Sequence, residues 1–588
     1  MLTIMISSLL SIAHASPGRI SVYCSPTQER STPTCRVVAD VLSKDATAVS
    51  VYNTSFNLST GFATLDITSA ASDVRLSAYA AGYAEGFQTA HEIAQFYQNV
   101  FEFGPAGPSR KLTEWVQEND AWTRAQAELL HATDDYWLSV ATVLDRFDGM
   151  LAGYAEAAAQ SNLTPLSKLD LLWVNLDGDL FDLQGAIGEP QLYGRLGRAA
   201  RSFVNGGYNS SRILRCSALF KLAQEDLFFG HATWDTYATA APRTFKHLAL
   251  PSRRNGTVSL RTVSMSSSPG FLASIDDYYL VGEPATSTVL GVIETSINID
   301  DRSAYQAITP QSVLCWIRSM VANQLAVDAP GWADSFGLEA SGTYNNQVLH
   351  ITPPISSPEA TVHHTSHLPF RPRPSLSPAA IDVSRLQWMV LDVAKARTRT
   401  ERGLSLLPNT FIVLEEVPGL VHFEDQTALL NEVKYWPSFN VIYYPETRKI
   451  AGSRGKYTDS VRYKLFAELQ GSVTSDAAMA RVIAWNDYQD DPIAQSPSQA
   501  IMSRGDLRAD GGRVASAELR ARSAGGGIDA KYSSVSTAAA VLASYGRAGP
   551  TNDDQPAFCW TKEFASTPHV GHPLCFDFAW GTFAPATM

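Results

Sequence analysis

The sequence predicts an α+β protein, because strand-like and helix-like segments gather in separate blocks along the chain instead of alternating. Hydrophobic residues make up 45% of the 588 residues and charged residues 18%, which is typical of a globular protein. A chain of this length holds about two to four ordinary domains, or one large sandwich with additions. These observations favour layered sheets with helices over a parallel, doubly wound fold.

The first third of the chain runs from strands into helices. Residues Arg19 to Val41 resemble strand, and parts of Val49 to Thr68 alternate apolar and polar side chains, which is the strand period. From Ala78 to about Ala159 large apolar residues recur at helical spacing. Ser167 to Leu183 begins as a helix, and we expect that helix to break at Gly178.

A β-hairpin is predicted next, after the glycine-rich stretch Gly194 to Arg212, which reads as an exposed loop. Cys216 to Leu222 and Leu227 to Thr233 are apolar runs rich in strand-forming residues. They flank the mostly polar Ala223 to Asp226, so a four-residue loop joins two antiparallel strands.

The register of this hairpin places Thr233 opposite Cys216 and His231 opposite Ala218. Because side chains alternate with period two, all four point to one face of the sheet. A thiol and an imidazole then lie close together. Two interpretations remain open at this point: a nucleophilic site, or a small buried Cys216 beside a hydrogen-bonded strand histidine.

The second half of the chain contains further strands and one helix. The predicted helix, Thr309 to Leu325, is amphipathic, and the stretch from Phe336 to Gln347 ends in a turn-rich run. The predicted strands are Val258 to Val263, Pro269 to Leu280, Thr288 to Ile297, Gln387 to Val393, Thr410 to Val417 and Phe439 to Tyr444.

Val348 to Gln387 breaks this pattern, because a proline every few residues excludes both helix and central strand. We expect most of it to be a disordered surface insertion. It contains four histidines, His350, His363, His364 and His367, but without a fixed scaffold a metal site there is not the favoured interpretation.

The N-terminus resembles a secretory signal peptide, residues 1–15, with an apolar run and small residues before an expected cleavage site after Ala15. Sequons for N-glycosylation agree with passage through the secretory pathway. No later apolar run reaches the roughly 18 residues that a membrane span needs. The five candidate glycosylation sites are Asn53, Asn57, Asn162, Asn209 and Asn255.

Six cysteines are few for this length, so disulfides are not the scaffold of the fold. Cys24 and Cys35 are close enough in sequence to close a small loop, as are Cys559 and Cys575. Cys315 lies in a helix-like run and is expected to be packed core. Cys216 is left without an obvious partner, which marks it as a candidate reactive thiol.

Charge and motifs exclude several functions. The formal net charge of -12 and the absence of any Lys/Arg run argue against a nucleic-acid partner. The chain has no G-x-S-x-G, H-E-x-x-H or G-x-x-x-x-G-K-[ST] motif. Arg504-Gly505-Asp506 reads as a chance match to an integrin-type tripeptide. Cys216 remains the best nucleophile candidate by elimination.

Ten segments, in order along most of the chain, resemble the phospholipase B-like family of N-terminal nucleophile hydrolases. They are Tyr79–Gly86, Asp177–Leu183, Cys216–Leu219, His231–Trp234, Asp276–Leu280, Ser341–Gln347, Tyr435–Asn440, Asn486–Gln489, Ser503–Leu507, and Gly549–Thr551 with Gln555-Pro556.

The resemblance implies a four-layer αββα sandwich, made as a precursor that cuts itself before the nucleophile. Cys216 would become the first residue of a C-terminal fragment, 216–588, that carries the nucleophile and the proline-rich block. A helix-rich N-terminal fragment, 16–215, would stay associated with it.

The resemblance also implies the site. A freed α-amine, with a pKa of roughly 8, can take the proton of the Cys216 thiol, and the thiolate attacks an acyl carbonyl. His231 shares the nucleophile's face. Asn345, Asn346 and Arg504 are assigned to oxyanion or substrate binding. No metal or cofactor is implied.

The chain departs from the family pattern at three places. Arg215 and Ala232 stand where His and Asn are usual in the family, which bears on self-cleavage and on a local hydrogen bond. The block Val348 to Gln387 separates the Asn-Asn-Gln turn from Trp388-Met389-Val390-Leu391-Asp392. It is either a retained intron in a gene model or a lineage-specific loop beside Asn345.

We therefore expect a secreted or lysosomal hydrolase that releases fatty acids from phospholipids. Its partners are a lipid substrate and, peripherally, a membrane surface. Two alternatives on the same scaffold are a lipid amidase and a catalytically silent lipid-binding glycoprotein. A third alternative, unrelated to the family, is a structural secretory protein with a buried Cys216 and an uncut chain.

Overall fold

The computed structural model describes most of the chain. The described residues are 18–26, 32–55, 57–101, 107–189, 215–283, 288–297, 299–344, 387–393, 395–397, 399–400, 403–453, 456–507 and 522–586. The expected signal peptide, the loop 194–212, Asn209, Asn345, Asn346 and residues 348–386 of the proline-rich block lie outside them.

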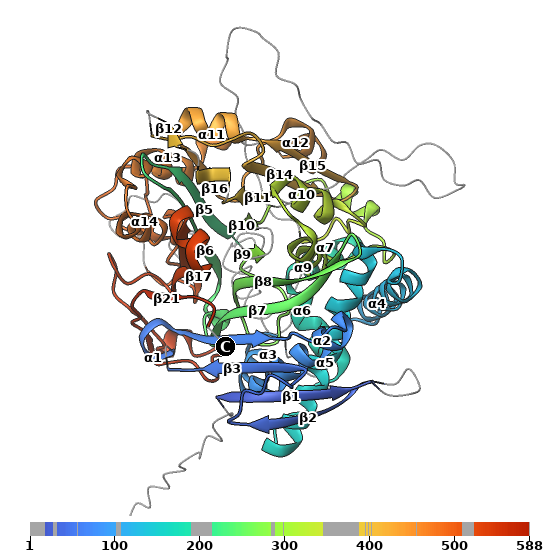
Figure 1. The fold of residues 1–588 in the computed structure, drawn as a ribbon. Coiled ribbons are helices and arrows are strands. Elements are labelled where there is room, and N and C mark those ends of the chain that lie inside the picture. The colour runs from blue at the N-terminus through green and yellow to red at the C-terminus, as the bar shows by residue number, and fades with distance from the viewer. Residues whose placement is uncertain are drawn as a thin grey trace, which may run out of the picture.

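A large sheet forms the centre of the molecule (Figure 1). Its neighbouring strands are antiparallel except β4 and β7, which are parallel. Within the described chain it has eleven strands, in the order β15 (Leu420–Asp425), β14 (Phe411–Val417), β11 (Gln387–Asp392), β10 (Thr288–Thr295), β9 (Tyr278–Glu283), β8 (Thr257–Ser267), β7 (Arg243–Arg254), β4 (Phe62–Thr68), β3 (Ala48–Asn53), β1 (Arg19–Ser25) and β2 (Thr34–Ala39).

A second, wholly antiparallel sheet carries the predicted hairpin. Across the described residues its order is β16 (Tyr435–Ser438), β5 (Arg215–Leu222), β6 (Leu227–Thr236), β17 (Gly525–Ser534), β18 (Ser544–Ala548) and β21 (Gly581–Phe583). Two short ribbons complete the strands: β12 (Arg399–Thr400) with β13 (Gly403–Leu404), and β19 (Phe558–Cys559) with β20 (Cys575–Phe576).

The helices divide into an N-terminal group and a later group. The first group is α1 (Asn57–Thr60), α2 (Val74–Gln88), α3 (Ala90–Val100), α4 (Arg110–Leu130), α5 (Asp135–Ser161), α6 (Lys168–Asn175) and α7 (Asp177–Ala186). The second group is α9 (Cys315–Leu325), α10 (Ala329–Gly337), α11 (Thr427–Val433), α12 (Pro445–Ala451), α13 (Val461–Leu469), α14 (Asp476–Ile483) and α15 (Val535–Val541). The predicted α+β class is confirmed.

The two sheets pack against each other, and each also packs against helices. On β9, Tyr278 and Leu280 join Phe220 and Phe229 of the hairpin in one apolar cluster between the sheets. The alternate residue Tyr279 faces the other way, into the cluster shared with α2 to α6, α9 and α10. On the far side of the hairpin, Leu219, Phe228 and other apolar residues contact α13 and α14. Figure 1 shows these two helix groups on opposite sides of the strands.

The hairpin is confirmed with the predicted register. Cys216 pairs with Thr233, Ala218 with His231, and Leu222 with Leu227 at the loop. The other predicted strands before β5 and from β8 to β14 match observed strands closely, except Pro269–Leu280, of which only Tyr278–Leu280 is strand, in β9. The helical region 78–159 corresponds to α2 to α5.

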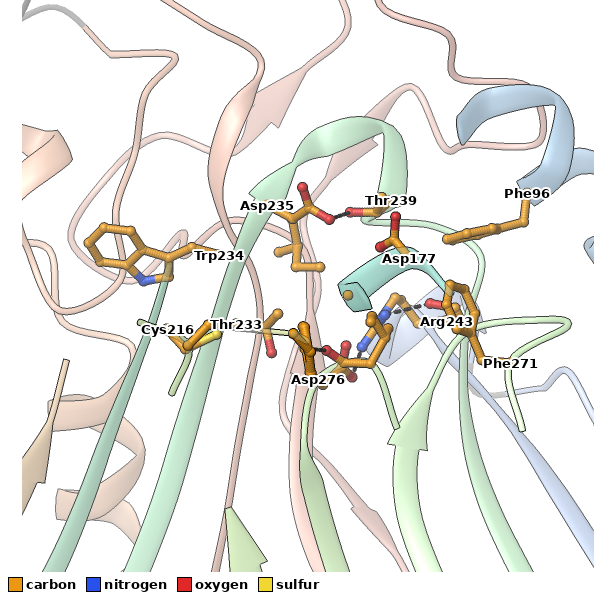
Figure 2. A pocket seen from close by; sticks show the side chains of 16 residues that line it. Phe96, Asp177, Cys216, Thr233, Trp234, Asp235, Thr239, Arg243, Phe271 and Asp276 are labelled. Atoms are coloured by element: carbon orange, nitrogen blue, oxygen red, sulfur yellow. Dashed lines mark hydrogen bonds and ion pairs between the residues drawn. The ribbon is translucent and has the colours of Figure 1, made fainter. Parts of the chain in front are cut away.

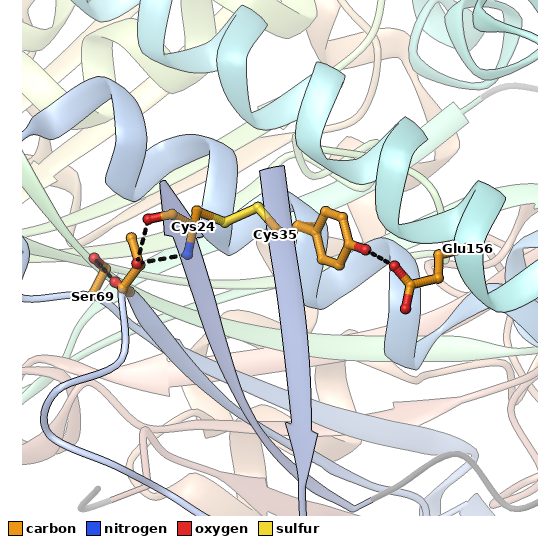
Figure 3. The surroundings of a disulfide bond; sticks show 6 residues. Cys24, Cys35, Ser69 and Glu156 are labelled. Carbon is orange, nitrogen blue, oxygen red and sulfur yellow. Dashed lines mark hydrogen bonds between the residues drawn. A yellow bond between two sulfur atoms is a disulfide. The ribbon is translucent and has the colours of Figure 1, made fainter. Parts of the chain in front are cut away.

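Two disulfides close the loops that the cysteine spacing allows: Cys24–Cys35 and Cys559–Cys575. The first joins β1 to β2 at paired positions, beside the hydrogen bonds between Cys24 and Thr47 (Figure 3). Cys315 is buried at 2% exposure in α9, as predicted. Cys216 and Cys315 are the free cysteines of the described chain.

Two predicted helix boundaries are wrong. The break expected at Gly178 occurs at Leu176, and Gly178 lies inside α7, where a Cβ would stand 2.1 Å from the ring of Tyr344. The glycine therefore permits close packing and does not end a helix. The helix expected from Thr309 begins only at Cys315, after Pro310, because Val313 pairs with Ala340 in an isolated β-bridge.

The strand predicted at Phe439–Tyr444 is also wrong; the strand is the preceding β16, Tyr435–Ser438. Asn440 has a left-handed backbone, with φ of 68°, which interrupts an extended chain. The amides of Tyr443 and Tyr444 donate to the Glu415 carboxylate at 2.7 and 3.2 Å instead of to a neighbouring strand.

Candidate active site

A pocket opens where the N-terminal end of β5 meets the C-terminal end of β6, and Cys216 and Thr233 line it (Figure 2). Its volume is about 480 Å³, counting the part that opens to solvent. Cys216 is only 7% exposed. The free thiol of Cys216 therefore lines this pocket while the residue stays almost fully buried.

Asn440 and Arg462 hold the backbone of Cys216. The Cys216 amide donates to Asn440 Oδ1 at 3.0 Å, and Arg462 Nη1 donates to the Cys216 carbonyl at 2.5 Å. Arg462 Nη2 also donates to Asn440 Oδ1 at 2.9 Å, and the carboxamide of Asn440 donates to Ser296 O at 2.6 Å. Two of these four hydrogen bonds thus hold the backbone of Cys216 directly, and the other two hold the Asn440 side chain.

A fully buried charge network lies beside the pocket. Arg243 pairs with Asp276 and, at 2.5 Å, with Asp529. Lys531 Nζ lies 2.6 Å from the other oxygen of Asp529 and 3.6 Å from Asp276. All four side chains have 0% exposure. Burial of unpaired charges would be very costly, so the two cations and two carboxylates stabilise one another.

Lys531 connects this network to the hairpin. Its Nζ donates to Thr233 Oγ1 at 2.5 Å, and that hydroxyl lies 3.3 Å from Nδ1 of His231. Because Thr233 Oγ1 accepts from Lys531, its own proton is available for His231 Nδ1. Burial and the charge of Lys531 lower the pKa of His231 well below 6.5, so this imidazole is neutral.

The surroundings hold the Cys216 thiol protonated. Burial and the nearby Glu294 raise its pKa, whereas the backbone amide of Trp234 and the charge of Lys531 lower it. Burial in turn lowers the pKa of Lys531 to about 8. A base is therefore needed before Cys216 can act as a nucleophile.

Two buried acids, Asp277 and Glu294, lie close enough for their charges to act on the Cys216 thiol. Burial raises the pKa of Asp277 to about 8, and burial together with Asp277 raises the pKa of Glu294. Tyr344 Oη donates to Asp277 Oδ2 at 2.5 Å. Two carboxyls in one buried site cannot both ionise easily, so the pair retains a proton near neutral pH.

A family model described as Phospholipase B matches residues 48–365 and 381–583. The chain belongs to the Phospholipase B family. The match is interrupted between 365 and 381, inside the proline-rich block. Residues 366–380 lie outside the matched ranges.

Relatives in distant organisms align over nearly the whole chain. The chain is 29% identical to a phospholipase B-like protein B of Dictyostelium discoideum, over 89% of this chain and 83% of the relative. It is 29% identical to a phospholipase B of Crotalus adamanteus, with 93% and 90% covered. It is also 29% identical to the phospholipase B-like 1 protein of Homo sapiens, with 93% and 89% covered.

The structure brings together only some of the residues expected to form the site of this Phospholipase B family member. Cys216 lines the pocket, and His231 lies next to it on β6, linked through Thr233. Arg504 does not line the pocket: its guanidinium binds Asp506 and the carbonyls of Thr551 and Pro556. Asn345 and Asn346 lie outside the described residues, although the adjoining Tyr344 lines the pocket.

Sequence reasoning missed Asn440, Arg462, Lys531 and Asp529 as residues that contact the nucleophile or its neighbours. Asn440 ends one of the ten resembling segments, which was the available signal. Nothing local marks the others, because they come from elements 240 or more positions away from Cys216. Among the described residues, no group of three or more His, Cys, Asp or Glu side chains is arranged to hold a metal ion.

Proposed function

We propose that this protein is a phospholipase B-like acyl hydrolase that releases fatty acids from phospholipids, with Cys216 as an N-terminal nucleophile. The observation that carries the proposal is the arrangement of Cys216: a free thiol lines the pocket while the amide of the same residue is held by Asn440. Thiol and future α-amine belong to one residue and face one site. The names of the aligned relatives support the same class of reaction.

Self-cleavage comes first in this scheme. The thiol of Cys216 attacks the carbonyl carbon of Arg215, the C–N bond breaks, and a thioester forms while the nitrogen takes up a proton. Water then hydrolyses the thioester, which leaves a carboxylate on Arg215 and a free amine and thiol on Cys216. In this scheme Thr233 and Lys531, which share a hydrogen bond, would guide proton transfer, and Asn440, which accepts from the Cys216 amide, would hold the freed amine.

Acyl transfer uses the new amine. The amine takes the thiol proton, the thiolate attacks the substrate carbonyl, and the leaving alcohol receives that proton back. Water releases the fatty acid from the thioester and restores the thiol. The need for this amine follows from the raised pKa of the buried Cys216 thiol. Asn345 and Asn346 are the proposed donors to the oxyanion.

The proposal includes the four-layer αββα sandwich of the N-terminal nucleophile hydrolases. The packing of successive layers supports it: helices α2 to α5 pack on the large sheet, the large sheet packs on the hairpin sheet, and the hairpin sheet packs on α13 and α14. Fragments 16–215 and 216–588 would stay associated, since β1 to β4 belong to the same sheet as β7 to β11.

Secretion or delivery to a lysosome, removal of residues 1–15 and N-glycosylation belong to the same proposal. Asn162 and Asn255 are exposed, Asn53 is partly exposed in β3, and Asn57 begins α1. None of the helices in the described ranges is long and apolar enough to cross a membrane. The lipid contact proposed here is peripheral.

Replacement of the nucleophile tests the function. Wild type should release fatty acid from phospholipid vesicles, and Cys216→Ala should reduce that release at least 1,000-fold, by about 4 kcal/mol in barrier height. Cys315→Ala is the matched control, because it removes the other free buried thiol. Equal release by wild type and Cys216→Ala would refute the assignment of Cys216 as the nucleophile.

Parallel assays with N-acyl amides decide between an esterase and an amidase. If the protein releases fatty acid from neither class of substrate, the result supports a silent lipid-binding protein.

A further inference from the structure

Beyond Cys216, the pocket is lined by two carboxyl groups. Within the described chain, neither of them forms an ion pair. Asp235 follows Thr233 by two residues on β6, and Asp177 begins α7. Both line the same pocket as the nucleophile. Figure 2 shows Asp177 and Thr239 on the side of the pocket away from Cys216, with Asp235 beside them.

Asp177 is the stronger sign of a missing partner. It is 8% exposed, lines the pocket, and within the described residues its carboxylate has neither a hydrogen bond nor an ion pair. Asp235 is only partly satisfied: it accepts from the Thr236 amide at 2.6 Å and from Thr239 Oγ1 at 3.2 Å. Buried polar groups are ordinarily paired, so an unpaired carboxylate aimed into a cavity needs an explanation.

The one cationic side chain among the described residues that line the pocket, Arg243, does not supply that partner. Arg243 lines the pocket, and its charge reaches Asp235, but its guanidinium is bound by Ser268, Asp276 and Asp529. Burial and the charge of Asp235 both raise the pKa of Asp177, because a second negative charge is unfavourable there without a counter-ion. A bound cation would remove this penalty.

The rest of the lining favours an organic cation over a metal ion. Phe96 and Phe271 line the pocket with ring centroids 5.5 Å apart and planes at 87°. Aromatic rings attract ammonium groups through their π-faces. A divalent metal would instead require more oxygen or nitrogen ligands than two carboxyls, and the described residues offer no cluster of three.

We propose that Asp177 and Asp235 form a subsite for the ammonium group of an amine-bearing phospholipid head group, lined by Phe96 and Phe271. The subsite rests on the proposed function and specifies its substrate class: ethanolamine or choline phospholipids rather than those with uncharged or acidic heads. It places the head group toward Asp177 and the scissile carbonyl at Cys216.

The spacing is compatible with one substrate molecule spanning both points. Thr233 lies opposite Cys216, and Asp235 is two residues farther along the strand, roughly 7 Å at ordinary strand rise. A carbonyl carbon and an ammonium nitrogen separated by a glycerophosphate linker reach that distance and more. The acyl chain must then leave the pocket on another side, away from Asp177.

The test compares head groups at constant acyl chains. In neutral detergent micelles, wild type should hydrolyse phosphatidylethanolamine at least about tenfold faster, as kcat/KM, than phosphatidylglycerol, because a charge-assisted hydrogen bond is lost with the second lipid. Asp177→Asn and Asp235→Asn should reduce that ratio to near one and change hydrolysis of phosphatidylglycerol less than about threefold. Asp182→Asn, a buried carboxyl on the same helix that binds Tyr305, is the matched control and should preserve the ratio.

A binding measurement separates this subsite from the hydrolase activity. Phosphoethanolamine should bind Cys216→Ala by calorimetry and bind at least about tenfold more weakly when Asp177→Asn is added. No head-group preference with intact hydrolysis, or equal loss on both lipids in the Asn variants, would overturn the subsite. Absence of all hydrolysis would overturn the proposed function alone, and absence of phosphoethanolamine binding would overturn the subsite alone.

Discussion

The backbone amide of Cys216 donates a hydrogen bond of 3.0 Å to Oδ1 of Asn440, 224 positions away in the sequence. Asn440 is held in turn by Arg462 and by the Ser296 carbonyl, and its own backbone is left-handed. An asparagine tolerates that conformation better than most residues. One side chain thus sets the position of the atom that would become the catalytic amine.

Removal of the Asn440 carboxamide should impair self-cleavage more than folding. Asn440→Gly keeps the left-handed backbone without strain, whereas Asn440→Ala adds strain. Both variants should slow the appearance of the two fragments about tenfold or more, because a hydrogen bond of about 1.4 kcal/mol to the reacting peptide is lost. Time courses on denaturing gels measure the rate. Cleavage of Asn440→Gly at the wild-type rate would contradict this role.

Replacement of Lys531 should shift the titration of the nucleophile. The charge of Lys531 lowers the pKa of the Cys216 thiol, so Lys531→Met should move the midpoint of iodoacetamide labelling of Cys216 to higher pH. Lys531→Arg retains the charge and is the control. Mass spectrometry of the labelled peptide reports the midpoint, and an unchanged midpoint in Lys531→Met would argue against coupling between the two residues.

Stability should fall as the pH rises from acid to neutral. Burial raises the pKa of Asp277 from 3.8 to about 8, so between these values the folded state keeps a proton that the unfolded state has lost. The contribution is therefore fully present below pH 4 and is lost as pH rises through 8, and it amounts to roughly 6 kcal/mol at most. Denaturant unfolding at several pH values measures it. Asp277→Asn should flatten the dependence, and an identical slope in that variant would exclude Asp277 as its source.

The disulfide between Cys24 and Cys35 should stabilise the edge of the large sheet. Its sequence separation is 11, for which the loss of chain entropy in the unfolded state is worth roughly 3 kcal/mol. The double variant Cys24→Ser/Cys35→Ser should lower the free energy of unfolding by about that amount. Reducing agent added to wild type serves as the control, because it should lower stability at least as far. A double variant as stable as wild type would contradict the estimate.

Arg504 should matter to the fold around the site. It binds Asp506 and two distant carbonyls, and its segment pairs with Gly526 at the start of β17, the strand that presents Asp529 and Lys531. Arg504→Lys cannot reproduce this fork of donors and should lower Tm by several degrees. Wild-type Tm with turnover reduced at least tenfold would instead support direct oxyanion binding.

Local pattern was enough to predict the hairpin, because period two and a polar four-residue loop determine both strands and register. The disulfides followed from short spacing and the lack of other nearby cysteines. The strand expected at Phe439–Tyr444 failed for a physical reason: Asn440 and the Glu415 carboxylate compete with strand pairing, and neither contact is local in sequence.

Of the expected site residues that the structure describes, it brings Cys216 and His231 together, as the hairpin pattern predicted, and leaves Arg504 outside the pocket. Asn440, Arg462 and Lys531 reach the nucleophile through sheet order and helix packing, which periodicity does not encode. Asp177 was visible only as part of a resembling segment. Its lack of a partner emerges from burial in a pocket made by α7, β6 and β7 together.

Determination of the N-terminal residue of the large fragment tests the central claim most directly. The purified protein is separated on a denaturing gel, and the larger band is sequenced from its amino end. The account predicts Cys216 as that residue in wild type and a single uncut chain in Cys216→Ala. A fragment beginning at any other residue, or wild type that remains uncut while it hydrolyses lipid, would contradict it.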